Sequence, residues 1–459
     1  MFKKNIYKTN TYNNFQQFYK STSASGILLI LSAFLAIIWS NSIFGASYHH
    51  FFETPLSLTI GNIVISYTIH HWINDGLMVV FFFMVGLEIK RELFIGELAS
   101  LKQALLPILG AVGGMVVPAL MYVLVNYDNP ESLKGWAIPM ATDIAFALGV
   151  LSLLGNRVPI GLKVFLAALA IVDDLGAVLV IALFYTSTIS YVALAWIGLF
   201  LFLLFLANRL HINYPLIYLL IGIGLWFAFM ASGIHSTIAG VLSAFMIPLS
   251  SVIVKNDFRT KVDKLWKEFK KIDIEIVTND TLFQTEEENK LADEQLYEQQ
   301  YHILHKLSDL SIKVQPALHR LEHNLDKWVG LIIMPIFALA NCGVDLSNFT
   351  FKSLIEPVSL GIIIGLFIGK IVGVYSAVYL AIKFKIASLP ENVNLKHIFG
   401  VSILCAIGFT MSLFVTGLSF GTGSEYENFA KIGILTASIS AGILGYIYLN
   451  NHLKNEIPD

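Results

Sequence analysis

Two adjacent carboxylates, Asp173 and Asp174, lie in the middle of an apolar run that extends roughly over residues 161–185. A helix of about 25 residues rises about 37 Å, enough to cross a bilayer core of about 30 Å with some tilt. Both carboxylates are about a dozen residues from either end of the run, and at that depth a charge costs at least about 2.5–3.5 kcal/mol. Interactions in the folded protein, or its function, must therefore account for both buried carboxylates.

The composition is that of a polytopic membrane protein. Of the 459 residues, 56% are hydrophobic and only 14% are charged, whereas soluble domains carry about 25% charged residues. The net charge of −2 gives no indication of nucleic-acid binding. The two cysteines, Cys342 and Cys405, stand in apolar runs and are interpreted as small buried hydrophobic residues. No nucleophile–base pair or metal cluster supports an enzyme, and we expect no cofactor.

The apolar runs predict an all-α protein of about twelve transmembrane helices. The expected spans are 26–44, 72–89, 103–125, 136–154, 161–185, 190–207, 214–231, 234–250, 328–346, 358–382, 397–419 and 429–449.

Lysine and arginine gather in one set of loops, whereas the other set holds only Lys134, Lys352 and Lys431. The positive-inside rule then places both termini in the cytoplasm, as an even number of spans also requires. We expect the following units: a cytoplasmic segment 1–25, helices 1–8 in 26–250, a charged cytoplasmic insertion 251–327, helices 9–12 in 328–450, and a cytoplasmic tail 451–459.

The insertion and the first external loop each carry a pattern of their own. Apolar residues recur at helical spacing between His302 and Asp326, which predicts an amphipathic helix on the membrane or on the helix bundle. We favour a solvated linker and a surface helix over a separate functional domain. The stretch from Leu56 to Ser66 alternates around Gly61-Asn62 and predicts a β-hairpin. Two interpretations of this segment stay open: the hairpin pairs with that of a second copy in a homodimer, or the segment is an ordinary capped loop.

Lys370 is the basic counterpart of the paired carboxylates. It stands about a dozen residues from either end of the tenth span, so it must pair, be neutral or face water. Neighbouring residues on a helix point about 100° apart. Asp173 and Asp174 therefore cannot both face one partner. One of them should pair with Lys370 and the other should face an open cavity, and the spacing leaves open which is which.

Two spans carry signs of interruption. The fourth has Pro139 followed by Thr142 and Asp143, and the eleventh has Gly408 and Thr410 at comparable depth. Such interruptions at matching places favour inverted repeats, helices 3–5 against helices 10–12, with the binding site where they meet. For the eleventh span, close helix packing by small residues is the alternative.

The oxygen atoms at this meeting point suit a hard cation such as Na⁺ or Li⁺, or a proton. Exchange would follow if a carboxylate held either Na⁺ or H⁺ but not both.

Several stretches together resemble the NhaA family of Na⁺/H⁺ antiporters. They are residues 85–93, 135–149, 168–176, 233–240, 321–323, 337–344, 369–370 and 406–412, and the resemblance covers roughly 25–250 and 315–450. It implies an electrogenic, pH-regulated exchanger of the bacterial inner membrane that exports Na⁺ or Li⁺ and imports more protons than sodium ions per cycle. The long insertion 255–315 departs from the compact loop of the family.

The resemblance also implies roles for single residues. Asp174 and Asp173 look like the carboxylates for Na⁺ and protons, and Lys370 looks like the partner of Asp173. Thr142 and Asp143 look like the residues of the unwound helix that compensate the helix ends and help to bind the ion or proton. The positions that match those tied to pH response are Glu88, His235, Glu322 and His323. Asp326 stands where the family has a second histidine.

Two other functions share this architecture. A cation channel lined by Asp143, Asp173 and Asp174 would conduct down a gradient, but Lys370 opposite the carboxylates would act as a barrier in a cation pore. A symporter for an organic anion would need basic or hydroxyl groups, whereas the membrane interior offers mainly carboxylates. Antiport is the favoured interpretation.

Overall fold

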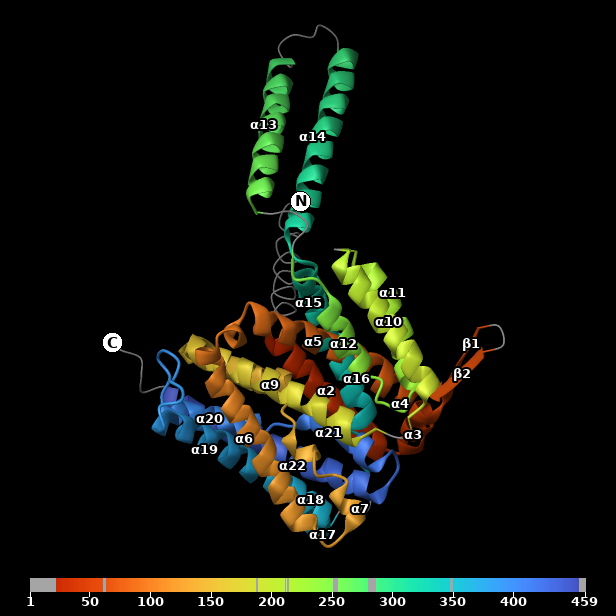
Figure 1. Cartoon of the computed structure of the whole chain (residues 1–459), viewed down its shortest axis with the longest axis vertical. Coiled ribbons are helices and arrows are strands. Elements are labelled where there is room, and N and C mark those ends of the chain that lie inside the picture. The colour runs from red at the N-terminus through yellow and green to blue at the C-terminus, as the bar shows by residue number, and fades with distance from the viewer. Residues whose placement is uncertain are drawn as a thin grey trace, which may run out of the picture.

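The computed structural model shows a bundle of long helices with a two-helix projection standing clear of it (Figure 1). It describes residues 22–60, 63–186, 189–210, 212, 214–250, 255–279, 286–346 and 350–453. Seven helical stretches are long and apolar enough to cross a membrane. They are Ala24–Asn41, Ile69–Phe94, Leu101–Asn126, Ile160–Phe184, Tyr191–Arg209, Pro357–Lys383 and Glu425–Leu453. The expected polytopic all-α class is confirmed.

Two further spans are broken, as predicted. The first consists of Pro130–Met140 and helix α8 (Ile144–Leu153), which are bent by 44°. The second consists of α20 (Leu395–Cys405) and α21 (Phe409–Phe420), bent by 43°. These are the interruptions expected from Pro139 and Gly408.

Shorter helices supply the remaining apolar elements among the described residues. Helix α11 covers Pro215–Met230, α12 covers only Ile238–Met246, and α15 (Ala317–Trp328) runs through a π-helical turn into α16 (Met334–Asn341). The eighth span is thus much shorter than the predicted 234–250.

The early end of α12 is held in place by polar side chains. Lys90 donates hydrogen bonds to the carbonyls of Phe245 and Ile247, and Asn208 donates to the carbonyl of Met246. The last carbonyls of the helix are therefore satisfied without a further turn.

The bundle contains two triplets of the same order, in which a long helix, a broken span and a long helix follow one another. The first is α6 (Leu101–Asn126), the broken span with α8, and α9 (Ile160–Phe184). The second is the continuous span formed by α18 (Pro357–Ile363), a π-helical turn and α19 (Lys370–Lys383), then the broken span α20–α21, then α22 (Glu425–Leu453). This order is the one expected for the repeats, helices 3–5 and 10–12.

Close packing of the first helix of each triplet positions Lys370. Gly365, Gly369 and Gly373 recur every four residues and face α6. A Cβ atom on Gly369 would lie 2.8 Å from the Cα of Pro118, and one on Gly373 would collide with the carbonyl of Gly113. Small residues at this spacing let two membrane helices approach closely.

We expect Gly369→Ala to lower the stability of the protein by about 1–3 kcal/mol, because the added methyl group overpacks the contact with Pro118. Thermal unfolding in detergent measures the loss. Gly198→Ala in α10 (Tyr191–Arg209) is the matched control, since no atom lies within 4 Å of a Cβ placed there. Equal melting temperatures for the two variants would contradict the packing argument.

The first external loop forms an antiparallel pair of strands, β1 (Pro55–Ile60) and β2 (Ile63–Thr68), with Leu58 opposite Ile65. The predicted hairpin is confirmed, while its turn residues Gly61 and Asn62 lie outside the described part of the chain.

The insertion forms two helices, α13 (Lys255–Asn279) and α14 (Glu286–Val314), which make up the projection in Figure 1. The helix that the sequence predicts between His302 and Asp326 is divided, because Pro316 separates α14 from α15. Proline lacks the N–H that a continuing helix needs.

Candidate functional site

The two broken spans meet at their interruptions, where each satisfies the free backbone groups of the other. The backbone N–H of Asp143 donates to the carbonyl of Ile407 at 2.7 Å, and the Thr142 hydroxyl donates to the carbonyl of Cys405 at 3.0 Å. In the opposite direction, Ser412 Oγ donates to the carbonyl of Ile138 at 2.9 Å. Such mutual bonding is what permits unwound backbone inside a membrane.

Asp143 caps two helices with one carboxylate. Its Oδ1 accepts from the N–H of Phe146 at 3.0 Å in the first turn of α8. Its Oδ2 accepts from the N–H and the hydroxyl of Thr410 in α21, at 3.2 and 2.5 Å. The N-terminal ends of both half-helices carry partial positive charge, so the buried negative charge of Asp143 is balanced by two helix ends.

Lys370 balances an opposite helix end and one of the paired carboxylates. Its fully buried ammonium group lies 2.7 Å from Asp173 Oδ2 and also donates to the carbonyl of Met140, where the first half of the broken span ends. C-terminal carbonyls carry partial negative charge. The structure therefore places Lys370 on Asp173 and not on Asp174, which the spacing left open.

Asp174 has no such partner. It is 2% exposed, and among the described residues none donates a hydrogen bond to its carboxylate or forms an ion pair with it. Oδ1 of Asp173 is also buried without a hydrogen-bond partner in the described part of the chain. Three carboxylate oxygens beside one ammonium group are thus available for a proton or a hard cation.

A cavity of about 320 Å³, here called the Glu88 cavity, brings three of the four predicted pH-response residues together. It lies between α5 (Met78–Phe94) and α15 and is lined by Met84, Glu88, Arg91, His319, Glu322, His323 and Asp326. Arg91 Nε lies 2.8 Å from Glu322 Oε1. The sequence analysis did not include Arg91 in the site, although its spacing of three residues from Glu88 places both on one helix face.

His235 lies elsewhere, in a second cavity of about 470 Å³ that we call the Asp75 cavity. There, Asp75 lies 3.0 Å from His71 Nε2 and 3.7 Å from His235 Nε2, and it accepts a hydrogen bond from Ser236 Oγ at 2.8 Å. Glu88 and Asp75 stand about 20 Å apart along one continuous helix. His235 therefore lies apart from the other three residues that match positions tied to pH response. The i, i+4 spacing of His71 and Asp75 was the signal that we missed.

These features define a class of protein. Two crossed, interrupted helices in matching positions, with charged groups buried at their meeting point, form the architecture of a secondary ion transporter.

Comparison with known proteins identifies the family within this class. The chain belongs to the Na⁺/H⁺ antiporter 1 family, which it matches over residues 16–449. It is 44% identical to the Na⁺/H⁺ antiporter NhaA of Sulfurimonas denitrificans over 437 residues, covering 95% of this chain and 94% of that protein. It is 43% identical to Na⁺/H⁺ antiporter NhaA 1 of Saccharophagus degradans (95% and 91% covered). It is 42% identical to the NhaA of Escherichia coli strain UTI89 (96% and 99% covered).

Proposed function

We propose that this protein exchanges Na⁺ or Li⁺ for protons. The observation that carries the proposal is the buried, unpartnered carboxylate of Asp174 beside the Asp173–Lys370 ion pair. Family membership supports the same exchange. A charge isolated at this depth is costly, so Asp174 gains stability by holding either a proton or a cation. Because one carboxylate cannot hold both at once, binding of Na⁺ expels the proton.

The Asp173–Lys370 pair supplies a second exchangeable proton. A Na⁺ ion between the two aspartates repels the Lys370 ammonium, which lies 2.7 Å from Asp173. Loss of the lysine proton removes that repulsion. One Na⁺ would then replace two protons, one from Asp174 and one from Lys370, and each exchange would move net charge across the membrane. Asp143 keeps the crossing intact, because both of its carboxylate oxygens accept hydrogen bonds from the helix ends.

The protein is proposed to lie in the bacterial inner membrane with both termini in the cytoplasm, as the distribution of Lys and Arg indicates. The Glu88 cavity then opens to the cytoplasm and the Asp75 cavity to the outside. Glu88, Glu322 and His323 would set the pH response from the cytoplasmic side, and His235 from the outer side. We expect His323→Ala to shift the pH profile of exchange, and an unchanged profile would exclude that role.

A proton-movement assay tests the proposal directly. In inside-out vesicles with a preformed proton gradient, added Na⁺ or Li⁺ is expected to collapse the gradient and K⁺ is not, when the assay is run across roughly pH 6.5–8.5, around the unperturbed range of histidine side chains in general. Vesicles without the protein are the control. Equal responses to K⁺ would indicate a channel, and no response in protein shown to be inserted would contradict exchange.

We further propose that two copies pair through the β-hairpin. A two-stranded sheet leaves the backbone groups at both edges unpaired and is marginal alone. Shortening the hairpin to remove residues 57–66 is expected to convert dimers into monomers in detergent, as measured by light scattering. A dimer that survives this deletion would place the interface elsewhere.

A further inference from the structure

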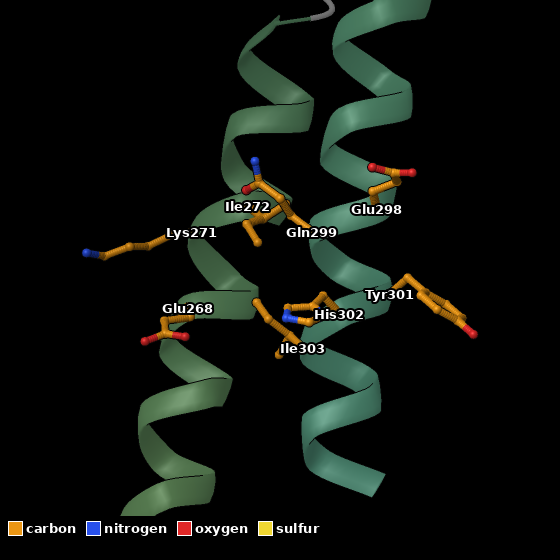
Figure 2. Close-up of a pocket in the computed structure, with 8 residues that line it drawn as sticks. All are labelled: Glu268, Lys271, Ile272, Glu298, Gln299, Tyr301, His302 and Ile303. Atoms are coloured by element: carbon orange, nitrogen blue, oxygen red, sulfur yellow. The ribbon is translucent and has the colours of Figure 1, made fainter. Parts of the chain in front are cut away.

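The projection formed by α13 and α14 has a groove along one side. Its volume is about 770 Å³, and Figure 2 shows the side chains that line it. Ile272 and Ile303, which lie between the two helices, are only 8% and 6% exposed and form an apolar floor. Glu268 stands on α13 and Glu298 on α14 (Figure 2). Neither carboxylate forms an ion pair with another described residue.

A pair of helices buries only the stripe along which they touch. The core of the projection consists of Ile272 and Ile303 with Leu265, Phe269 and Leu307 packed against them. The groove continues this core to the surface and has the form that receives a third segment with apolar anchors. The two carboxylates of Glu268 and Glu298 outnumber the single ammonium group of Lys271 in the lining, and the resulting negative charge favours a basic segment.

The first eight residues of the chain have this chemistry. Phe2 and Ile6 are apolar residues four apart, and Lys3, Lys4 and Lys8 supply positive charge. Residues 1–52 contain no Asp or Glu. The segment therefore complements both the floor and the charge of the groove.

The length of the chain allows these residues to reach the groove. Ser25, near the start of α2 (Thr22–Asn41), lies against Gly330, just beyond the end of α15. The path from Gly330 back along α15 and α14 to His302 is about 28 residues, or about 42 Å of helix. The stretch from Lys8 to Thr22 spans up to about 50 Å when extended, whereas residues from Tyr12 onward reach at most about 36 Å.

We propose that residues 1–8 of this chain dock in the α13–α14 groove, with Phe2 and Ile6 over Ile272 and Ile303. The consequence is a tether from the first membrane span to the projection. Helix α14 is connected through Pro316 to α15, which carries Glu322 and His323. The tether therefore constrains the position of α15. It thereby links the segment before the first span to the lining of the Glu88 cavity.

Disulfide cross-linking in the full-length protein tests the docking. The natural cysteines, Cys342 and Cys405, are buried, so the introduced pair Ile6→Cys and Gln299→Cys reports the contact. Lys270→Cys is the matched control for the second position, because Lys270 directly precedes the lining residue Lys271 on α13 but does not itself line the groove. We expect a cross-link within one chain at position 299 that exceeds the control at least roughly tenfold.

Charge-reversal variants distinguish docking of residues 1–8 in the groove from chance encounters of the two introduced cysteines. Replacing Lys3, Lys4 and Lys8 by Glu should lower the cross-linking yield about threefold to tenfold, and adding Glu268→Lys and Glu298→Lys should restore it. Equal yields at positions 299 and 270, or no effect of charge reversal, would overturn the proposal. A product of two chains would overturn it as well, by showing that the groove takes the segment of a second copy. None of these readouts depends on transport.

Discussion

Replacing Asp174 by Asn is expected to reduce Na⁺-dependent proton movement to the level of vesicles without the protein. The amide keeps the shape of the side chain but cannot take up and release a proton, and it offers no net charge to a cation. Asp174 has no described hydrogen-bond or ion-pair partner to lose, so the melting temperature in detergent should stay the same or rise. The vesicle assay and thermal unfolding measure the two effects.

Asp128→Asn is the control for this change, because Asp128 is exposed in the loop before α7 (Pro130–Leu133). That variant should transport like the original protein. Full exchange in the Asp174→Asn protein would remove Asp174 from the mechanism. Loss of exchange together with a large drop in melting temperature would indicate a structural role instead.

Lys370→Ala is expected to destabilise the protein by about 3–5 kcal/mol as well as to impair transport. The substitution leaves Asp173 as an uncompensated charge in a fully buried position and removes the hydrogen bond to the carbonyl of Met140. Thermal unfolding in detergent gives the loss of stability. Lys396→Ala, at an exposed position, should change neither property.

A second substitution isolates the ion pair. If the loss comes from the stranded carboxylate, Asp173→Ala combined with Lys370→Ala should be more stable than Lys370→Ala alone. Additive losses from the two single changes would mean that Asp173 and Lys370 do not depend on each other, and the pairing that we describe would then be wrong.

The sequence was informative about the site where charge is rare. Asp173, Asp174 and Lys370 stand out because charged residues are so costly in the middle of apolar spans. Spacing along one helix, however, does not tell how that helix is rotated against its neighbours. Spacing therefore left open whether Asp173 or Asp174 pairs with Lys370; the family resemblance implied Asp173, and the packing of α9 places Lys370 on that residue.

The hydrophobic pattern along the chain did not predict every boundary and contact. The apolar run 234–250 continues beyond the end of α12, but Pro248 favours an extended conformation at Ile247 and so ends the helix there. Lys90 from another helix then satisfies the last carbonyls. The resemblance implied a role in pH response for both His235 and Glu88, but a linear sequence does not reveal that His235 lies beside Asp75, about 20 Å from Glu88 along the helix. The resemblance implied that Asp143 compensates helix ends, but the sequence does not show which N–H groups its carboxylate accepts from, since the second capped helix begins about 265 residues later.

The shared cap at Asp143 also restricts how the protein can move. Pulling α8 away from α21 would leave at least one helix start without its counter-charge in a medium that contains no water to replace it. The crossing should therefore behave as a rigid hub through the whole transport cycle. Access to Asp174 would then switch from one side to the other by displacement of the surrounding helices, and the hub itself would contribute almost nothing to the barrier for that motion.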